Sequence, residues 1–311
     1  MSTPAVAHSR SPTIPQALPP HLTPLETAVW RAIAYADVFD YPLTAVEVHR
    51  YLVEAAATLP EVEASLDHLA ETHLCQANTY YTLPGRQNTV AIRQERGEHA
   101  RQLWPVALKY GRLLSSLPFT RMVAVTGSLA VDNVALNGDI DYLLVVANGR
   151  VWLNRAFAIL IVRLAARHGH TLCPNYILAE NALFFSEHNL YTAHEVAQMV
   201  PLSGLPVYQQ MRQMNSWTAA FLPNANGAPH VMGDGRALHP HLQALAELPL
   251  RTPLGQWLDR WEMQRKIRKF QPQAAGSDAA FSRNWCKGHF DTHKQYALTA
   301  YQTRLEERPR P

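Results

Sequence analysis

Two aspartates separated by one residue, Asp139 and Asp141, lie at the start of a long apolar run. Aspartate is depleted in β-strands, and side chains two residues apart on a strand point to the same face. Two carboxylates on one face repel each other unless a cation lies between them. Mg²⁺ prefers oxygen ligands and is usually held by one or two carboxylates together with substrate phosphates. The pair therefore predicts a metal site, with Asp139 and Asp141 as the metal ligands.

A glycine–serine pair lies ten residues before the first of these aspartates and offers groups that suit a phosphate. Residues 122–126 predict a short strand, and residues 129–133 predict the start of a helix. Gly127 permits a tight turn and a close approach of ligand to backbone. Ser128 offers a hydroxyl and a backbone N–H at the predicted helix start, a place that favours anions. We therefore expect Gly127 and Ser128 to bind nucleotide phosphates.

The strand, the Gly-Ser turn and the Asp-x-Asp strand together resemble the DNA polymerase beta-like nucleotidyltransferase superfamily. The resemblance is strong over residues 121–147 and weaker out to about residue 200. It implies an α/β (α+β) fold, in which helices flank a mixed sheet. It also implies a Mg²⁺-dependent enzyme with two metal ions, which transfers a nucleotidyl group from an NTP to an acceptor. The sequence leaves the acceptor open between RNA, protein and a small molecule.

A surface turn followed by an exposed strand is the simpler explanation of the same residues. That explanation predicts alternating polar and apolar residues after the aspartates. Instead, residues 142–146 form an unbroken apolar run, which is typical of a strand buried on both faces. The run therefore favours the nucleotidyltransferase interpretation.

Members of this superfamily supply a third carboxylate from a later strand, where it helps to activate the attacking hydroxyl. Residues 172–178 are the matching strand in this chain, and Asn175 is the nearest equivalent by position. An asparagine can bind a metal through oxygen, but it has no negative charge and is a poor base. Glu180, at the end of the strand, is the alternative if it points inward. We expect Asp139, Asp141 and Asn175 as catalytic residues, and a catalytically inactive nucleotide-binding or DNA-binding regulator is the alternative function.

Residues 21–92 predict a winged-helix-like domain. Helices are expected after Thr23 and Thr44, each followed three residues later by glutamate as in a capping box, and from Pro60, while residues 80–92 predict a hairpin wing. Domains of this kind commonly bind DNA through the third helix, which needs Lys and Arg to contact phosphates. Here that helix contains four acidic residues, Glu61, Glu63, Asp67 and Glu71. DNA binding is therefore disfavoured, and a scaffold or dimerisation role is favoured.

The rest of the chain can be divided by composition and periodicity. The expected division is a disordered tail over 1–20, the winged-helix-like domain over 21–92, a connecting helix over 93–117, the nucleotidyltransferase domain over 118–225 and a C-terminal helical region over 226–311. The connecting helix has a basic side that suits phosphate or a nucleic-acid acceptor, although a solvated helix face is the commoner explanation. Its cations are Arg93, Arg96, Arg101, Lys109 and Arg112.

Composition excludes several classes of protein. The 311 residues are 47% apolar and 17% charged, which is ordinary for a globular chain, and the net charge of +3 is too small to imply a polyanionic partner. The three cysteines lie far apart, so no disulfide framework is expected and a reducing cytoplasmic setting is favoured. No segment reaches the roughly 20 apolar residues that a membrane-spanning helix needs, so no membrane partner is expected.

Overall fold

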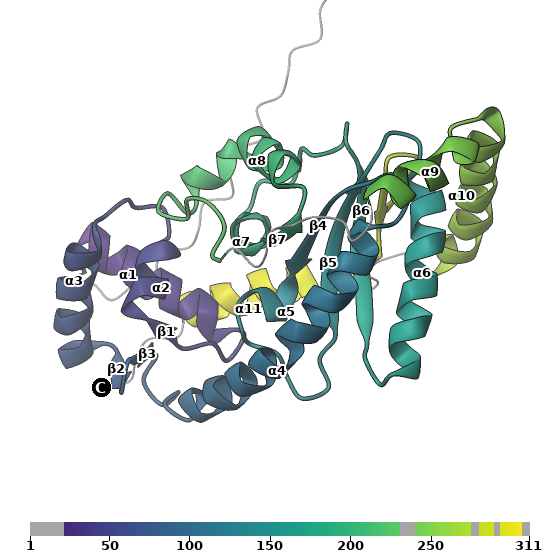
Figure 1. Cartoon of the computed structure of the whole chain (residues 1–311). Coiled ribbons are helices and arrows are strands. Elements are labelled where there is room, and N and C mark those ends of the chain that lie inside the picture. The colour runs from purple at the N-terminus through teal and green to yellow at the C-terminus, as the bar shows by residue number, and fades with distance from the viewer. Residues whose placement is uncertain (1–21, 231–239, 275–279, 289–292, 307–311) are drawn as a thin grey trace, which may run out of the picture.

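A computed structural model describes residues 22–230, 240–274, 280–288 and 293–306 (Figure 1). The predicted disordered tail, residues 1–20, lies outside the described residues. The described chain is a mixed α/β structure with helices and two separate sheets, which confirms the α/β character expected from the sequence. Within these ranges, no helix combines the length and apolar character that crossing a bilayer requires.

The N-terminal part of the chain packs three helices around a small sheet with strand order β1-β3-β2. Capping boxes begin its first two helices, because Thr23 and Thr44 each accept a hydrogen bond from the backbone of a glutamate three residues later. The elements are α1 (Pro24–Asp37), β1 (Leu43–Thr44), α2 (Ala45–Arg50), α3 (Leu59–Thr72), β2 (Cys75–Ala77) and β3 (Tyr80–Thr82). We call residues 22–88 the N-terminal unit.

The hairpin of this unit differs from the predicted one. The sequence predicted a hairpin over residues 80–92, but β3 pairs with the preceding β2, and the turn between them lies at Asn78 and Thr79. Residues 89–92 instead form the first turn of the long helix α4 (Thr89–Ser115), in which Thr89 and Val90 are buried. Four residues are too few to distinguish a strand from a helix by periodicity.

The larger sheet has strand order β7-β4-β5-β6-β9-β8. β4 and β5 are antiparallel, whereas β5 and β6 are parallel and are joined across a helix, so the sheet is mixed as expected. Between residues 120 and 179 the predicted alternation of strand and helix is confirmed. The elements are β4 (Thr120–Thr126), α5 (Gly127–Ala130), β5 (Ile140–Val146), α6 (Val151–Arg167) and β6 (Leu172–Ala179).

Helices cover both faces of this sheet. On one face Tyr142 and Leu144 of β5 pack in a core shared with α4 and α6. On the opposite face Leu143 and Val145 pack against α7 and α8. Because Asp141 is two residues before Leu143, strand alternation places it on the α7 face. The covering elements after β6 are α7 (Leu190–Gln198), α8 (Leu205–Met214) and a 3₁₀ turn (Ser216–Ala220), and between the two helices β7 (Val200–Ser203) joins the sheet beside β4.

The C-terminal region is not wholly helical, which corrects the expectation for 226–311. Two short strands, β8 (Ala280–Phe281) and β9 (Trp285–Lys287), extend the large sheet, and β9 pairs antiparallel with β6. Strands of two or three residues show no usable period in sequence. The helices of this region are α9 (Pro240–Leu250), α10 (Pro253–Ala274) and α11 (His293–Glu306).

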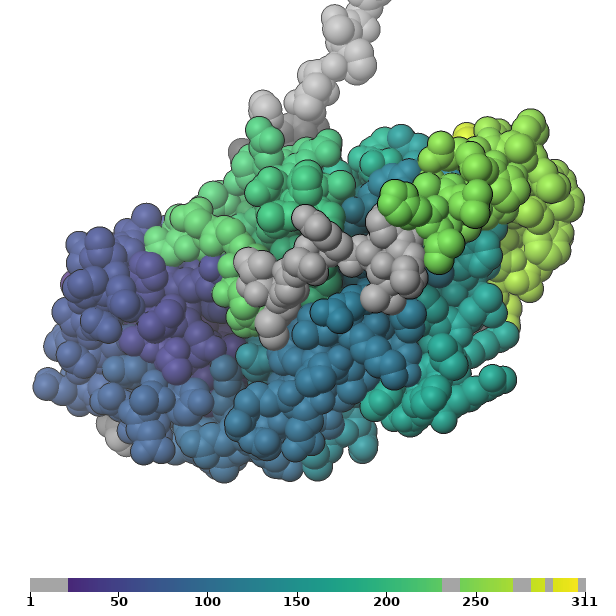
Figure 2. Space-filling view, viewed as in Figure 1, coloured from purple at the N-terminus to yellow at the C-terminus, as the bar shows by residue number. Residues whose placement is uncertain are grey.

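The N-terminal unit contacts several segments of the rest of the molecule. Figure 2 shows this unit, in purple, in continuous contact with the blue and green segments that follow. α11 lies beside α1, where Arg304 forms an ion pair with Asp37 at 2.7 Å (Figure 1). From α4, Arg93 reaches Glu47 at 2.8 Å. Part of the predicted basic side of this helix therefore binds the N-terminal unit.

Candidate functional site

The Gly-Ser turn and the Asp-x-Asp strand meet at one edge of the large sheet. Thr126, the last residue of β4, pairs with Asp141 of β5, so the turn that follows lies directly beside the aspartate. Gly127 has a φ of +64°, and a Cβ built there would overlap Oδ2 of Asp141 and lie 3.2 Å from its Cγ. Backbone conformation and close approach therefore both require glycine at this position. The helix that begins here, α5, is shorter than predicted and ends at Ala130.

The two aspartates form an acidic cluster with suitable geometry for a cation. Ligand atoms of Asp139, Asp141 and Cys173 all lie within 4.8 Å of one another. Burial raises the pKa of Asp141 well above its usual value, and the nearby carboxylates of Asp139 and Glu195 raise it further. Both charged groups that act on Asp141 are thus acidic, and a cation bound between the aspartates would relieve their repulsion.

Cys173 belongs to this cluster, and its thiol is protonated in the metal-free protein. Burial, with the charges of Asp141 and Asp139, raises its pKa to about 12, so the sulfur is protonated at neutral pH. Only a thiolate binds metals well. Its S–H instead donates to Oδ1 of Asn175 at 2.6 Å. The oxygen ligands of the cluster are therefore the two carboxylates, a set that fits a hard cation such as Mg²⁺.

Asn175 lies where the sequence placed it, beside the aspartates. An extra residue in β6, between the pairs Asp141–Cys173 and Leu143–Tyr176, makes a bulge at Pro174, which proline tolerates. From this bulge the buried Asn175 side chain donates through Nδ2 to Oδ1 of Asp141. Its amide therefore orients the Asp141 carboxylate.

Glu180 is not near the aspartates, so the alternative in which it replaces the third carboxylate is wrong. Its backbone N–H bonds the carbonyl of Val146, at the opposite end of β5 from Asp141. Five residues of strand at ~3.3 Å each separate the two ends. The Glu180 side chain instead lies 3.8 Å from the guanidinium of Arg121.

A cavity of about 520 Å³ opens over this edge of the sheet. Its size is within the range typical of small-molecule sites. Every site residue predicted from the sequence lines it: Gly127, Ser128, Asp139, Asp141 and Asn175. The facing wall comes from the N-terminal unit and from α7, and includes Tyr35, Phe39, Tyr191, His194 and Glu195.

This facing wall was not found from the sequence. Its residues are distant along the chain from the Asp-x-Asp motif, and no local pattern links them to it. One signal was present in α7, where Leu190, Ala193 and Ala197 form a buried apolar face. His194 lies on that face and is itself buried, which is an unusual position for a polar side chain.

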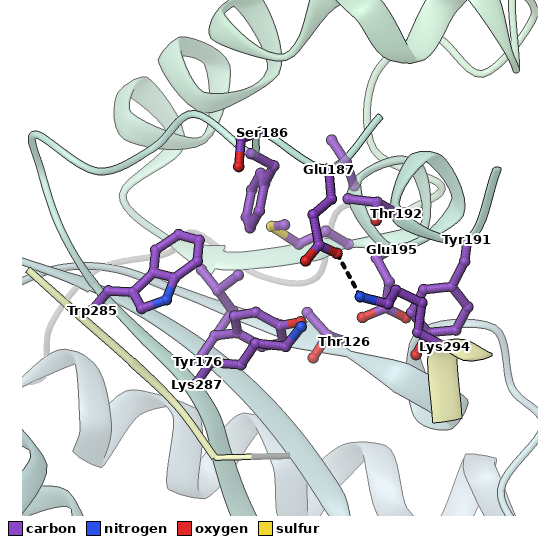
Figure 3. Close-up of a pocket in the computed structure, with 14 residues that line it drawn as sticks. Thr126, Tyr176, Ser186, Glu187, Tyr191, Thr192, Glu195, Trp285, Lys287 and Lys294 are labelled. Carbon is purple, nitrogen blue, oxygen red and sulfur yellow. Dashed lines mark hydrogen bonds and ion pairs between the residues drawn. The ribbon is translucent and has the colours of Figure 1, made fainter. Parts of the chain in front are cut away.

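Glu195 is a third carboxylate at the site and comes from a helix instead of a strand. Burial raises its pKa to about 7, although Lys287 opposes the shift. Glu195, Thr126 and Tyr191 also line a smaller pocket of about 90 Å³ that adjoins the main cavity (Figure 3).

The smaller pocket combines charged and aromatic groups. Figure 3 shows Glu187, Glu195 and Lys294 together on one side of it and Trp285 on the other. Lys294 donates to Glu187 at 2.8 Å, and Lys287 lies 5.4 Å from the ring centre of Tyr176. Charged and hydroxyl groups therefore line the smaller pocket together with Glu195.

The chain was compared with protein-family models, with curated proteins and with solved structures, and none of them matches it. Its function must therefore be inferred from the residues and geometry of the two pockets.

Proposed function

We propose that this chain is a Mg²⁺-dependent nucleotidyltransferase of the polymerase beta-like type, which uses an NTP as its donor. The proposal rests on one observation: the Gly-Ser turn lies against Asp141, one of two neighbouring carboxylates, at the edge of a cavity large enough for a nucleotide. Phosphate-binding and metal-binding groups on adjacent strands are what a metal–triphosphate complex needs.

Each residue at the sheet edge has a distinct role in this proposal. Asp139 and Asp141 would hold two Mg²⁺ ions, which would supply positive charge to stabilise the attacking and leaving oxygens. The hydroxyl of Ser128 and the backbone N–H groups of the turn bind the phosphates. Asn175 fixes the orientation of the Asp141 carboxylate through its hydrogen bond.

Glu195 supplies the acid–base group that Asn175 cannot. It lines both the main cavity and the smaller pocket, so it lies between the donor nucleotide and an acceptor that enters the smaller pocket. We assign it the role of accepting the proton of the acceptor hydroxyl. A pKa of about 7 suits this transfer near neutral pH, since a general base works best when its pKa is close to the operating pH.

The N-terminal unit acts as a wall of the active site in this proposal. Its order of helices and strands supports a winged-helix-like fold, with α3 as the third helix. The four acidic residues of α3 are all exposed, which opposes contact with DNA phosphates. Tyr35 of α1 and Phe39 of the turn that follows it instead line the cavity. The three free cysteines suit a reducing cytoplasm.

A labelling experiment tests the proposal. The full chain is incubated with each of the four NTPs, labelled at the α-phosphate, with Mg²⁺ and with total RNA, the protein itself or small hydroxyl compounds as acceptors. We expect label in a product, loss of the label with EDTA, and a loss of at least 100-fold in Asp141→Asn. The matched control is Asp67→Asn, the same chemical change at an exposed site on α3.

The outcomes distinguish the proposed transferase from the alternative, an inactive regulator. Saturable NTP binding without any labelled product would support the alternative, a catalytically inactive nucleotide-binding regulator. Undiminished labelling in Asp141→Asn would contradict the proposed site.

A further inference from the structure

His194 joins α7 to α1 in the wall of the cavity that faces the aspartates. Its imidazole stacks on the ring of Tyr35, with ring centres 4.1 Å apart and an angle of 9° between the planes. Only 4% of His194 is exposed, and the residue lines the cavity together with Asp139 and Asp141. A flat pair of rings is therefore built into the wall opposite the metal ligands.

A hydrogen bond with Gln198 favours the His194 tautomer that carries its proton on Nε2, the ring nitrogen without a partner among the described residues. Nε2 of Gln198 lies 3.2 Å from Nδ1 of His194, and an amide nitrogen is a donor, so Nδ1 is the acceptor. Burial lowers the pKa of His194 to about 3, so the ring is neutral and carries its single proton on Nε2. Nε2 is buried and has no hydrogen-bond partner within the described residues.

Because His194 lines the cavity, a ligand there would supply the acceptor that its donor lacks, and the chemistry of the wall restricts which ligand this is. A neutral N–H among aromatic rings gives no charge to bind a phosphate, which is better served by cations or helix ends. It suits a ring nitrogen or a carbonyl oxygen of a flat, uncharged heterocycle. An unpartnered buried donor is costly, so a ligand that accepts its hydrogen bond is favoured.

Phe39 adds a stacking surface beside this donor. Its ring lies 5.5 Å from that of Tyr35, it lines the cavity, and 38% of the residue is exposed. Its carbonyl accepts hydrogen bonds from Arg96 of α4 at 2.9 Å and from Asn133, between α5 and β5, at 3.0 Å, and these bonds hold the segment in place. The surface is thus positioned before any ligand binds.

We propose that His194, Tyr35 and Phe39 form the nucleobase subsite of the cavity, where the Nε2–H of His194 donates to an acceptor atom of the base. This inference rests on the proposed function, because the triphosphate end of the same ligand lies at Asp139 and Asp141. The wall formed by α7 and the N-terminal unit then selects the base, while the edge of the sheet binds the phosphates.

A comparison of NTP binding with tripolyphosphate binding tests the base subsite separately from the phosphate site. Isothermal titration of the full chain with Mg²⁺ is carried out with each of the four NTPs and with inorganic tripolyphosphate, which has no base. His194→Phe keeps a flat ring against Tyr35 but removes the donor. We expect it to weaken binding of the preferred NTP about tenfold, the scale of one hydrogen bond, and to leave tripolyphosphate binding unchanged.

A second variant keeps the proposal testable if His194→Phe does not fold. Phe39→Ala changes a partly exposed ring, and we expect it to weaken NTP binding severalfold without affecting tripolyphosphate. Unchanged NTP binding in both variants, or equal losses for NTP and tripolyphosphate, would overturn the nucleobase subsite alone. If neither ligand binds the unsubstituted chain, the proposed function fails, and the subsite is rejected with it.

Discussion

Gly127 and Asp141 lie so close together that no side chain fits between them. A Cβ at position 127 would overlap Oδ2 of the aspartate, and the φ of +64° at this glycine is one that other residues rarely adopt. The turn that offers phosphate-binding groups and the carboxylate that would bind a metal are thus in direct contact. One residue therefore sets the spacing between two parts of the site.

Gly127→Ala tests this contact. We expect the variant to lose at least 100-fold in transferase activity, because the new methyl group displaces the Asp141 carboxylate. The positive φ should also lower the free energy of unfolding by about 1–2 kcal/mol. Gly85→Ala is the matched control, since Gly85 has a φ of +78° with nothing within 4 Å of its built Cβ. Thermal unfolding should show a similar backbone penalty in both variants, and only Gly127→Ala should lose activity. Equal activities would contradict the proposed coupling.

Asp141→Asn should stabilise the metal-free protein while abolishing its response to metal. The substitution removes a buried negative charge that Asp139 and Glu195 repel, so we expect the free energy of unfolding to rise by about 1 kcal/mol. Added Mg²⁺ should raise the unfolding temperature of the unsubstituted protein, because a ligand that binds only the folded state stabilises it. The same addition should not shift Asp141→Asn. A Mg²⁺-dependent shift that survives in this variant would exclude Asp141 as a ligand.

Asp37→Asn should weaken the attachment of α11 to the N-terminal unit. Asp37 is 5% exposed and accepts from Arg86 and Arg304, each at 2.7 Å. Loss of its charge removes the carboxylate that Arg304 contacts on the N-terminal unit, whereas Arg86 keeps its ion pair with Asp40. We expect roughly 2 kcal/mol of destabilisation, less than for a fully buried pair, because both arginines are partly exposed. Denaturant unfolding measures the change, and the exposed pair of Glu98 and Arg101 provides the control: Glu98→Gln should change stability by less than 1 kcal/mol.

The sequence was sufficient for the sheet edge that contains the Asp-x-Asp motif. β4 and β5 are apolar runs, so their burial follows from strand periodicity. The expectation that both aspartates lie on one strand is only half right, because β5 begins at Ile140 and Asp139 comes just before it. Even Asn175 could be placed, because β6 follows β5 through a single helix. The predicted hairpin wing was wrong at residues 89–92, because four residues can be assigned equally well to a strand or to a helix, and here they begin α4.

The opposite wall of the cavity could not be predicted, because long-range packing creates it. Tyr35 and His194 are stacked although they are far apart in the sequence, and nothing near either residue indicates the other. Glu195 illustrates the same limit. Position along the strand suggested that Asn175 takes the place of the third carboxylate, with Glu180 as the alternative. Instead, α7 folds over the sheet and brings the carboxylate of Glu195 to the cavity.

Glu195→Gln tests the proposed general base through the pH dependence of the reaction. A base acts when it is ionised, so activity of the unsubstituted enzyme should fall as the pH drops below about 7, the pKa of Glu195. The glutamine variant cannot ionise, and we expect at least a 100-fold lower rate with no inflection near pH 7. Glu187→Gln is the control in the same pocket, and its profile should keep that inflection.

The pH dependence of the free energy of unfolding tests Glu195 independently of activity. The pKa of Glu195 in the folded protein lies above its ordinary value of 4.5, so burial disfavours the ionised form. The contribution of this group to stability is therefore complete below about pH 4.5 and is lost as the pH rises to about 7. Glu195→Gln should be more stable than the unsubstituted protein at pH 8 and similar to it at pH 4. If the two proteins kept the same difference in stability at both pH values, Glu195 would have an ordinary pKa, and the smaller pocket would lose its proposed base.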